Sequence, residues 1–244
     1  MYYITNLLYY NNIMKQITAQ KILIKVKNDY NEIANDFDIT RVNSWPEFAV
    51  FDKYIKNNSH ILDVGCGNGR LLKSLPRKIN YTGIDVSNKL IKIAKQSFTG
   101  AIFKTGDILN LKLNKNSFNI VLAIAVLNHV PSEKLRIQAV KEIYRVLKPG
   151  GYLLMTNWNL YQKKYKYLVK KNSDGFDKGD ALVPWRNPEG ELLQERYYHS
   201  FTLKELEYLA KQNHLKIIKQ FYSLKGKPVE RKNGYNTLSV WQKQ

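Results

Sequence analysis

Apolar and polar residues alternate along the chain in blocks that favour strands and helices in turn. Four mostly apolar residues, 61–64, run into a glycine-rich turn, and the amphipathic stretch 70–75 follows. This order predicts a strand, a tight loop and a helix. The stretch 118–126 is continuously apolar, as expected for a strand buried on both faces of a parallel sheet. Further strands are expected at 81–86, 101–104, 152–157, 215–222 and 237–241.

Helix signals lie between most of these strands. Ser87 and Ser132 are each placed to cap a helix, and the second helix ends before Lys148-Pro149-Gly150-Gly151, a stop-and-turn signal. The alternation predicts an α/β fold with a doubly wound, mostly parallel sheet that binds ligands at the carboxyl ends of its strands. Helices are also expected at 15–37, at Pro46 with Ser44 as the cap, and at 202–212.

Three glycines, Gly65, Gly67 and Gly69, follow the strand at 61–64. Glycine lets the backbone take positive φ and approach a ligand closely. A loop of this kind between a strand and a helix presents backbone N–H groups to a bound ligand. The G-x-G-x-G spacing differs from the G-x-G-x-x-G fingerprint, so a nicotinamide cofactor is disfavoured.

The chain is expected to form one domain, residues 1–244, because it shows neither repeats nor a linker. The alternation breaks at Trp158, where a long charged and aromatic segment begins. Such a segment between core elements is usually where binding specificity lies. The expected parts are an N-terminal helical part at 15–58, a cofactor-binding core at 59–157, a substrate-binding insertion at 158–200, and a C-terminal helix with strands at 201–244. Either Met1 or Met14 is the start of translation.

The formal net charge of +19 and the isoelectric point of about 9.7 indicate a polyanionic partner, with nucleic acid the first candidate. The alternative is codon bias, because Lys, Asn, Ile and Tyr all have A/T-rich codons. Several lysines cluster, which favours the partner.

Cys66 is the only cysteine, which excludes an intramolecular disulfide and a cysteine-based zinc site. It fits a reducing, cytoplasmic location, and we interpret it as a small packing residue. Residues 1–10 do not read as a signal peptide. The longest apolar run, 120–127, is far shorter than the ~20 residues that span a bilayer. A soluble protein without membrane contact or bound metal is expected.

Five motifs in order, ILDVGCGNG, GIDVS, GDI, FNIVLAIAVLNHV and EIYRVLKPGG, resemble the class I S-adenosylmethionine-dependent methyltransferases. The resemblance implies a Rossmann-like, seven-stranded sheet. It also implies that Asp63 and the glycines hold the methionine part of the cofactor, Asp85 the ribose hydroxyls, and Asp107 the adenine edge. The cofactor-binding residues implied in this way are Asp63, Gly65, Cys66, Gly67, Asn68, Gly69, Asp85, Val86, Asp107, Ile108 and Ala125.

Each of these acids also has a plainer interpretation. A lone Asp85 or Asp107 is more often a turn residue at the end of a strand, and a lone His129 a packing or helix-start histidine. Their positions after consecutive strands favour the binding roles. In the family, residues 125–129 would line the opening through which the methyl group leaves.

A narrower resemblance lies outside the core. The segments Tyr30 to Phe37, Thr40-Arg41 and Trp45-Pro46 are similar to the N-terminus of the eukaryotic-type wobble-uridine carboxymethyl methyltransferases. VPWRNPEGE and RYYHSFTLKELEYL are similar to the same family, which includes the methyltransferase domain of the AlkB-like tRNA enzyme and its yeast counterpart. The resemblance implies methyl esterification of the 5-carboxymethyl group of the wobble uridine in the anticodon stem-loop of tRNA. It also implies a small zinc-binding activator subunit as a partner.

The implied reaction suits the residues near these motifs. A carboxylate is ionised at neutral pH, so methyl transfer requires placement and charge recognition more than a strong base. Arginine binds carboxylates or phosphates with two prongs, and aromatic rings stack on unstacked bases. The catalytic candidates are Arg41, His129, Arg196, Tyr197 and His199. The substrate-binding candidates are Asn128, Trp158, Trp185, Tyr198, Lys163 and Lys164.

The plainer alternatives are core packing for each aromatic residue and a solvated surface for each lysine. If the family role holds, the run 163–171 and the cluster Lys225, Lys227, Arg231 and Lys232 would bind tRNA phosphates. A rival enzyme is a small-molecule methyltransferase of the quinone or metabolite type, for which a buried, apolar acceptor pocket would count. A third interpretation is a catalytically idle cofactor- or RNA-binding subunit.

Overall fold

The computed structural model describes residues 14, 16–41, 46–76, 78–169, 175–187 and 189–244. The expected cap Ser44, the motif residues Trp45 and Pro188, and the basic residues Lys170 and Lys171 lie outside this range.

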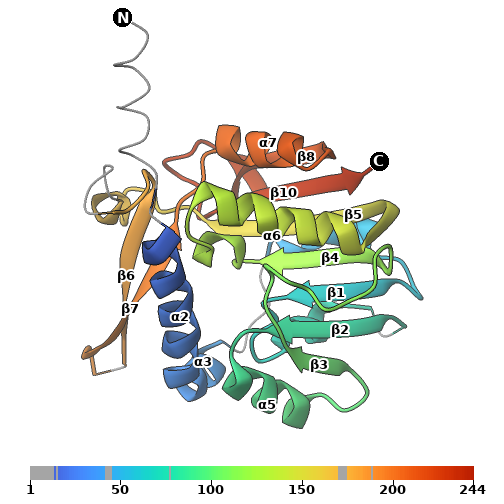
Figure 1. Ribbon diagram of the computed structural model, residues 1–244, viewed down its shortest axis with the longest axis horizontal. Coiled ribbons are helices and arrows are strands. Elements are labelled where there is room, and N and C mark those ends of the chain that lie inside the picture. Colours follow the sequence, from blue (N-terminus) through green and yellow to red (C-terminus); the bar gives the residue numbers. More distant parts are fainter. Residues whose placement is uncertain (1–13, 15, 42–45, 77, 170–174, 188) are drawn as a thin grey trace, which may run out of the picture.

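A sheet of eight strands forms the centre of the molecule (Figure 1), in the order β3-β2-β1-β4-β5-β10-β8-β9. Strands β1 to β5 run parallel, and β10 lies antiparallel between β5 and β8. The doubly wound, mostly parallel fold expected from the alternation is confirmed. The strands are β1 (His60–Val64), β2 (Asn80–Asp85), β3 (Ile102–Thr105), β4 (Phe118–Ile124), β5 (Leu147–Trp158), β8 (Leu215–Leu224), β9 (Lys227–Val229) and β10 (Asn236–Lys243).

The eighth strand, β9, was not expected from the sequence. Lys225 and Gly226 both have positive φ, 52° and 83°, and form the tight turn that folds β9 back onto β8. Two consecutive residues with positive φ match the right-handed twist of a hairpin.

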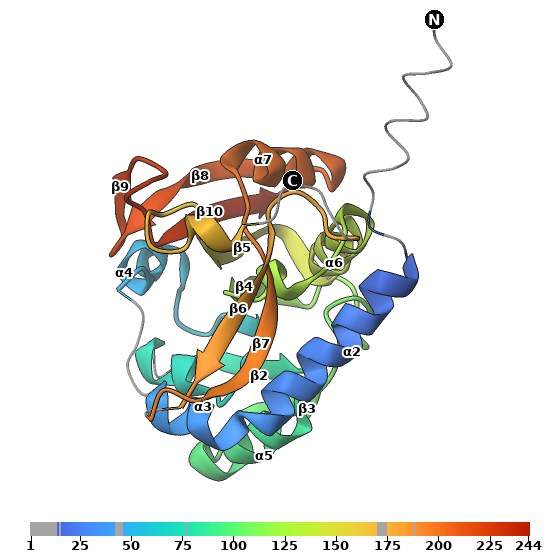
Figure 2. The same ribbon diagram turned by 90° about the vertical axis from the view of Figure 1, so that its left-hand side faces the viewer.

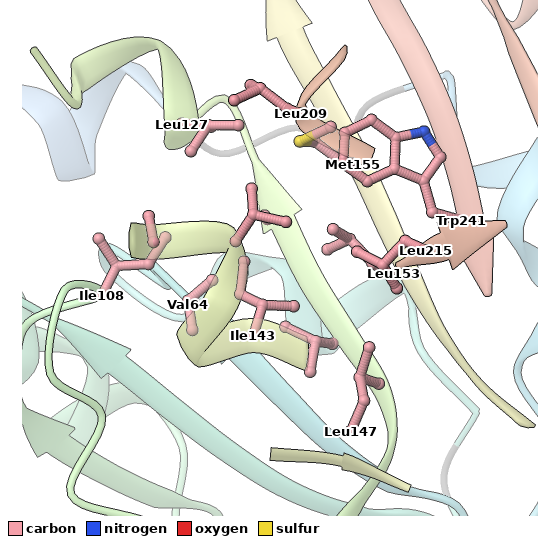
Figure 3. Close-up of a cluster of buried hydrophobic side chains, with 14 of the residues drawn as sticks. Val64, Ile108, Leu127, Ile143, Leu147, Leu153, Met155, Leu209, Leu215 and Trp241 are labelled. Atoms are coloured by element: carbon pink, nitrogen blue, oxygen red, sulfur yellow. The ribbon is translucent and has the colours of Figure 1, made fainter. Parts of the chain in front are cut away.

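Both faces of the sheet carry apolar clusters. Ile61 and Leu62 are fully buried neighbours on β1, and they belong to different clusters because successive side chains point to opposite faces. Figure 3 shows one of these clusters, which includes Ile143 of α6 and Leu209 of α7, with Met155 beside the Trp241 ring.

Three helices begin at side-chain caps. The Ser87 and Ser132 hydroxyls accept the backbone N–H groups of Leu90 and Leu135, as expected, and Thr202 forms a capping box with Glu205. The helices are α2 (Gln16–Glu32), α3 (Ala34–Thr40), α4 (Phe48–Phe51), α5 (Asn88–Ser97), α6 (Glu133–Val146) and α7 (Leu203–Gln212), with 3₁₀ turns η1 (Asp52–Tyr54), η2 (Arg70–Ser74), η3 (Leu127–His129) and η4 (Lys166–Leu168).

Two local expectations are corrected. The stretch after the glycine loop forms only the 3₁₀ turn η2, because Pro76 holds Leu75 in an extended conformation with ψ of 155°. Residues 148–151 do not separate the helix from the strand but lie within β5, where they shift its pairing with β4. Phe118 pairs with Leu147, and Ile120, two residues further on, pairs with Tyr152. The helix continues directly into β5.

The segment expected as an insertion contains an antiparallel hairpin, β6 (Asp180–Arg186) and β7 (Leu192–His199). Figures 1 and 2 show it beside α2, on the side to which the arrowheads of β1 and β4 point. Ala19, Ile22 and Val26 of α2 pack against Tyr197 of β7. The hairpin and α2 therefore cover the carboxyl ends of the parallel strands. None of the helices described is long and apolar enough to cross a membrane.

Candidate active site

A cavity of about 570 Å³ opens at the carboxyl ends of β1, β2 and β4. The glycine loop, the ends of β2 and β4 and the segment after β3 form one side, while α2, α3, β5 and β7 form the other. Its lining includes Gly65, Gly67, Asp85, Val86, Gly106, Ile108, Ala125, Tyr30, Phe37, Arg41, His129, Trp158, Lys164, Tyr165, Arg196 and Tyr198. The cavity thus contains predicted cofactor residues on one side and predicted acceptor residues on the other.

The glycine loop has the backbone that its sequence predicts. Gly65 and Gly67 have φ of 69° and 56°. A Cβ at Gly65 would lie 2.3 Å from the Val126 side chain, and one at Gly67 would lie 3.3 Å from the Phe37 ring. Any larger residue would therefore need both a strained backbone and a displaced neighbour.

Asp85 ends β2 with its carboxylate at the cavity. Its Oδ2 accepts the Gly67 N–H at 2.9 Å and its Oδ1 accepts the Ser87 N–H at 2.8 Å. Burial raises the pKa of this carboxyl, while the two backbone donors act in the opposite direction. Each oxygen keeps a lone pair that can accept a hydroxyl from a ligand.

Asp63 lies beneath the glycine loop. It is 2% exposed and accepts the Tyr81 hydroxyl at 2.7 Å, and burial raises its pKa to about 7. Asn68 donates to Asp38 at 2.7 Å and so links the loop to α3. Of the predicted cofactor residues, Asp63, Cys66, Asn68, Gly69 and Asp107 do not line the cavity.

Asp107 is exposed, and its Oδ1 accepts the Leu109 N–H at 2.9 Å. The cavity is lined instead by its neighbours Gly106 and Ile108. The third strand therefore presents backbone and an apolar side chain to the cavity, where the sequence predicted a carboxylate.

The residues on the cofactor side of the cavity suit the chemical groups of S-adenosylmethionine. The loop has an open backbone, Asp85 can accept two ribose hydroxyls, and Ile108, Val86 and Leu90 form an apolar surface suited to adenine. These residues would hold the cofactor.

On the acceptor side, His129 uses both ring nitrogens. Nδ1 lies 2.9 Å from the Tyr197 carbonyl oxygen, which can only accept, so Nδ1 carries the proton. Nε2 lies 2.9 Å from the Tyr30 hydroxyl and accepts a hydrogen bond from it. Burial, and next the nearby charge of Arg196, lower the pKa of His129 to about 3. His129 is therefore neutral and positions Tyr30; neither nitrogen is free to act as a base toward a substrate.

Arg196 is a buried cation that forms no salt bridge with the residues described, although the charge of Asp29 acts on it. It is 6% exposed, its Nη1 donates to the Tyr30 hydroxyl at 3.3 Å, and its Nε has no hydrogen-bond partner. No described carboxylate forms a salt bridge with it. A buried charge is costly unless it is paired, so this guanidinium is prepared for an anion.

Trp185 holds arginines instead of offering a free face to a base. The guanidinium carbons of Arg196 and Arg41 lie 4.4 Å and 4.9 Å from its ring centroid, and Phe37 stacks on it at 6.4 Å. Cation–π contacts of this kind fix the position of both side chains. Trp158 lines the cavity and meets Tyr198 edge-on at 5.2 Å.

Two predicted catalytic residues, Tyr197 and His199, point away from the cavity. The Tyr197 hydroxyl donates to Asp180 at 2.7 Å, and His199 Nδ1 lies 2.7 Å from the same carboxylate oxygen. The correction follows from strand geometry, because alternate residues of β7 face opposite sides: Arg196 and Tyr198 face the cavity. Recognising β7 as a strand would have supplied that signal.

Of the remaining predicted substrate-binding residues, one lines the cavity and two do not. Lys164 lines the cavity, whereas Lys163 is exposed outside it. Asn128 is fully buried outside the lining, and its side-chain nitrogen and oxygen have no hydrogen-bond partner among the residues described. Tyr30 and Phe37 were assigned no role from the sequence, although both lie in the N-terminal segment that resembles the tRNA enzymes.

Comparison with known proteins agrees with this geometry. Residues 62–155 match the methyltransferase domain family. A tRNA (carboxymethyluridine(34)-5-O)-methyltransferase from Arabidopsis thaliana is 38% identical over 58% of this chain and 34% of its own length. One from Schizosaccharomyces pombe is 32% identical over 74% of this chain and 84% of its own length. The chain spans about a third of the Arabidopsis relative and most of the fission-yeast one.

Solved structures share the fold. An S-adenosylmethionine-dependent methyltransferase from Methanosarcina mazei is 28% identical with a TM-score of 0.65, covering 80% of this chain and 96% of that one. A complex of the Trm112 methyltransferase activator of Haloferax volcanii with a putative methyltransferase contains a chain with the same fold, at 15% identity, a TM-score of 0.63, and coverage of 89% and 96%.

The identity to the fission-yeast relative extends over most of that protein, and the fold and the cavity are those of a cofactor-dependent methyltransferase. The chain therefore belongs to the S-adenosylmethionine-dependent tRNA (carboxymethyluridine(34)-5-O)-methyltransferase family.

Proposed function

We propose that this chain transfers a methyl group from S-adenosylmethionine to the carboxylate of 5-carboxymethyluridine at the wobble position of a tRNA anticodon. The observation that carries the proposal is Arg196, a buried guanidinium at the cavity that forms no salt bridge with a described carboxylate. An acceptor carboxylate would supply the missing charge. Two relatives are named as tRNA (carboxymethyluridine(34)-5-O)-methyltransferases, which supports this acceptor.

The bond changes are simple. S-adenosylmethionine, held by the glycine loop and Asp85, would supply an electrophilic methyl group. Esterification of an ionised carboxylate with this group would release no proton. The neutral, fully engaged His129 agrees with a reaction that needs no base.

The protein's part in this reaction is placement. Arg196 would hold the carboxylate, and Arg41 would add a second positive charge across the Trp185 ring. Tyr30 accepts from Arg196 and donates to His129, so the three side chains fix one another. Held geometry of this kind removes much of the entropic cost of bringing two reactants together.

Basic residues beside the cavity would bind the phosphates of tRNA. Lys163, Lys164 and Lys166 are exposed, and the Arg231 guanidinium lies 4.8 Å from the ring centroid of the adjacent Tyr161. This contact brings the 163–166 segment close to the second basic cluster, Lys225 to Lys232. Binding of this kind weakens steeply with salt.

A small zinc-binding activator subunit belongs to the proposal as a partner. The family resemblance supports this partner, so the reaction should be tested both without and with such a subunit.

The small-molecule methyltransferase is disfavoured by the acceptor side of the cavity. The acceptor side carries aromatic rings that could contact a quinone-like acceptor, but a neutral acceptor has no need of the three cations Arg41, Lys164 and Arg196 that line it as well. A catalytically idle subunit is disfavoured by the intact glycine loop and Asp85.

The test is nucleoside mass spectrometry on tRNA that carries 5-carboxymethyluridine, incubated with the purified protein and S-adenosylmethionine. The expected result is a gain of one methyl group on that nucleoside. The reaction is repeated with a zinc-binding activator subunit added. No gain in either reaction would overturn the proposed acceptor.

A further inference from the structure

A second cavity of about 280 Å³ adjoins the first. It lies between the end of α3, the segment around η4 and the β6–β7 hairpin. Four residues line both cavities: Arg41, Trp158, Tyr165 and Arg196. The remaining lining residues are Thr40, Tyr167, Leu168, Val183, Pro184, Trp185 and Arg186.

Positive charge dominates this second cavity. Arg41, Arg186 and Arg196 line it, and no acidic residue appears in its described lining. None of the three forms a salt bridge with a described carboxylate. Three guanidinium groups that share one small cavity repel one another, so the cavity favours an anionic ligand.

Two of these arginines are held in place by the protein. Arg186 donates through Nη1 to the Gly190 carbonyl at 2.8 Å, within the turn of the hairpin. Arg41 lies over the Trp185 ring. A pre-organised arginine pair is suited to the tetrahedral oxygens of a phosphate, to which each guanidinium can donate twice.

The proposed function gives Arg186 no role and gives Arg41 only that of a second positive charge near Arg196. If Arg196 holds the acceptor carboxylate at the junction of the two cavities, Arg41 and Arg186 remain for another anion of the same substrate. The nearest anion in a nucleotide is the phosphate attached to its ribose. Trp158 and Tyr165 lie along the junction, where a pyrimidine ring would connect the two charged groups.

We propose that the second cavity binds a phosphate of the acceptor nucleotide through Arg41 and Arg186. This inference rests on the proposed function and adds to it: the substrate recognised is a nucleotide gripped at two anions, its carboxylate and its flanking phosphate. The protein would therefore discriminate strongly between a nucleotide and a free nucleoside.

Calorimetric titration at fixed ionic strength tests this directly, with four probes: 5-carboxymethyluridine, its 5′-monophosphate, its 3′-monophosphate and uridine 5′-monophosphate. For the wild-type protein, at least one of the two carboxymethyluridine monophosphates is expected to bind at least tenfold more tightly than the nucleoside. Which of them does so identifies the flanking phosphate. Equal binding of the nucleoside and both monophosphates would overturn the inference.

Arg186→Ala is expected to abolish most of this preference while leaving S-adenosylmethionine affinity unchanged. Lys178→Ala is the matched control, because Lys178 is an exposed cation near the other end of the same hairpin and does not line the cavity. The control should keep the wild-type preference. If both variants weaken nucleotide binding equally, the effect is net charge and the phosphate site is wrong.

The same titrations separate this inference from the proposed function. If the carboxymethyl group adds no affinity but uridine monophosphate still binds in an Arg186-dependent way, the phosphate site stands and the proposed acceptor fails. If the carboxymethyl group adds affinity and the phosphate adds none, the proposed acceptor stands and the second cavity has no phosphate role.

Discussion

The two sides of the main cavity are built in opposite ways. The cofactor side comes from the ends of β1, β2 and β4 and the segment after β3, and it presents an open glycine backbone, an apolar surface and the Asp85 carboxylate. The acceptor side comes from segments far apart in the sequence and presents cations and aromatic rings, represented by Tyr30, Arg41, His129, Trp158 and Arg196.

The difference in charge corresponds to the difference in proposed ligand. A carboxylate such as Asp85 accepts hydroxyl groups, and it gains little from binding an anion. A guanidinium without a salt bridge, such as Arg196, can bind an anion, and this pairing offsets the free-energy cost of burying its charge. The four predictions below test whether the two sides act independently, from the largest expected effect to the smallest.

Removing the Asp85 carboxylate should disable the cofactor side alone. Asp85→Ala loses two hydroxyl contacts to a charged acceptor, each about 1.5–3 kcal/mol, so S-adenosylmethionine affinity should fall on the order of a thousandfold by calorimetry. Asp107→Ala is the control, because its exposed carboxylate lies outside the cavity lining. Unchanged affinity in Asp85→Ala would show that the ribose site lies elsewhere.

Removing the Arg196 charge should disable the acceptor side alone. Arg196→Met keeps most of the side-chain volume, and losing a buried charge contact costs about 2–5 kcal/mol. We expect kcat/KM on the anticodon stem-loop to fall by roughly 100-fold or more, with S-adenosylmethionine affinity within about twofold of wild type. The kcat/KM of Arg196→Lys should lie between those of Arg196→Met and the wild type, because lysine keeps the charge and loses the two-pronged geometry. A loss of cofactor affinity equal to the loss of turnover would contradict the independence of the two sides.

The Asp63 carboxyl should make the ligand-free protein less stable as pH rises. Its folded pKa of about 7 lies above the ordinary value of 3.8, so between these values the folded state holds a proton that the unfolded state has lost. The free energy of unfolding therefore falls as pH rises through this window. Asp63→Asn lacks this titration. Relative to the wild type, its free energy of unfolding should therefore increase by a few kcal/mol up to pH 7.5, at about 1.4 kcal/mol per pKa unit.

Urea unfolding of wild type and Asp63→Asn at pH 4.5 and pH 7.5 measures this difference. Asp85 is present in both proteins, and its charge is one cause of the raised pKa of Asp63, so the measured difference includes this coupling. Parallel changes in the two proteins would mean that Asp63 does not carry the effect.

Tyr30→Phe should give the smallest change. It removes the hydroxyl between Arg196 and His129, and a hydrogen bond of this kind is worth about 1 kcal/mol. We expect KM for the stem-loop to rise up to about tenfold while cofactor affinity stays constant. His129 should contribute no ionisation near pH 6.5 to the wild-type rate, because burial lowers its pKa to about 3. A step near 6.5 that disappears in His129→Asn would make His129 a base.

Several features of the fold follow from short stretches of sequence. The apolar runs of the parallel strands, the caps Ser87 and Ser132, and the positive φ of the glycines depend on neighbours within a few residues. The apolar spacing of residues 70–75 predicted a helix, but Pro76 favours an extended Leu75 and limits this stretch to the short turn η2. The Lys225–Gly226 turn was missed because lysine rarely takes positive φ.

The sequence by itself determined the cofactor side, because consecutive parallel strands end at one edge of a sheet and bring Gly65, Asp85 and Ile108 together whatever the rest of the chain does. Only the tertiary structure decided the acceptor side. The pairing of β7 with β6 determines that Arg196 faces the cavity and Tyr197 does not, and the packing of α2 on β7 places Tyr30 between His129 and Arg196. The contacts of Tyr30 with His129 and Arg196 join residues 99 and 166 positions apart, and no local pattern specifies that they will meet.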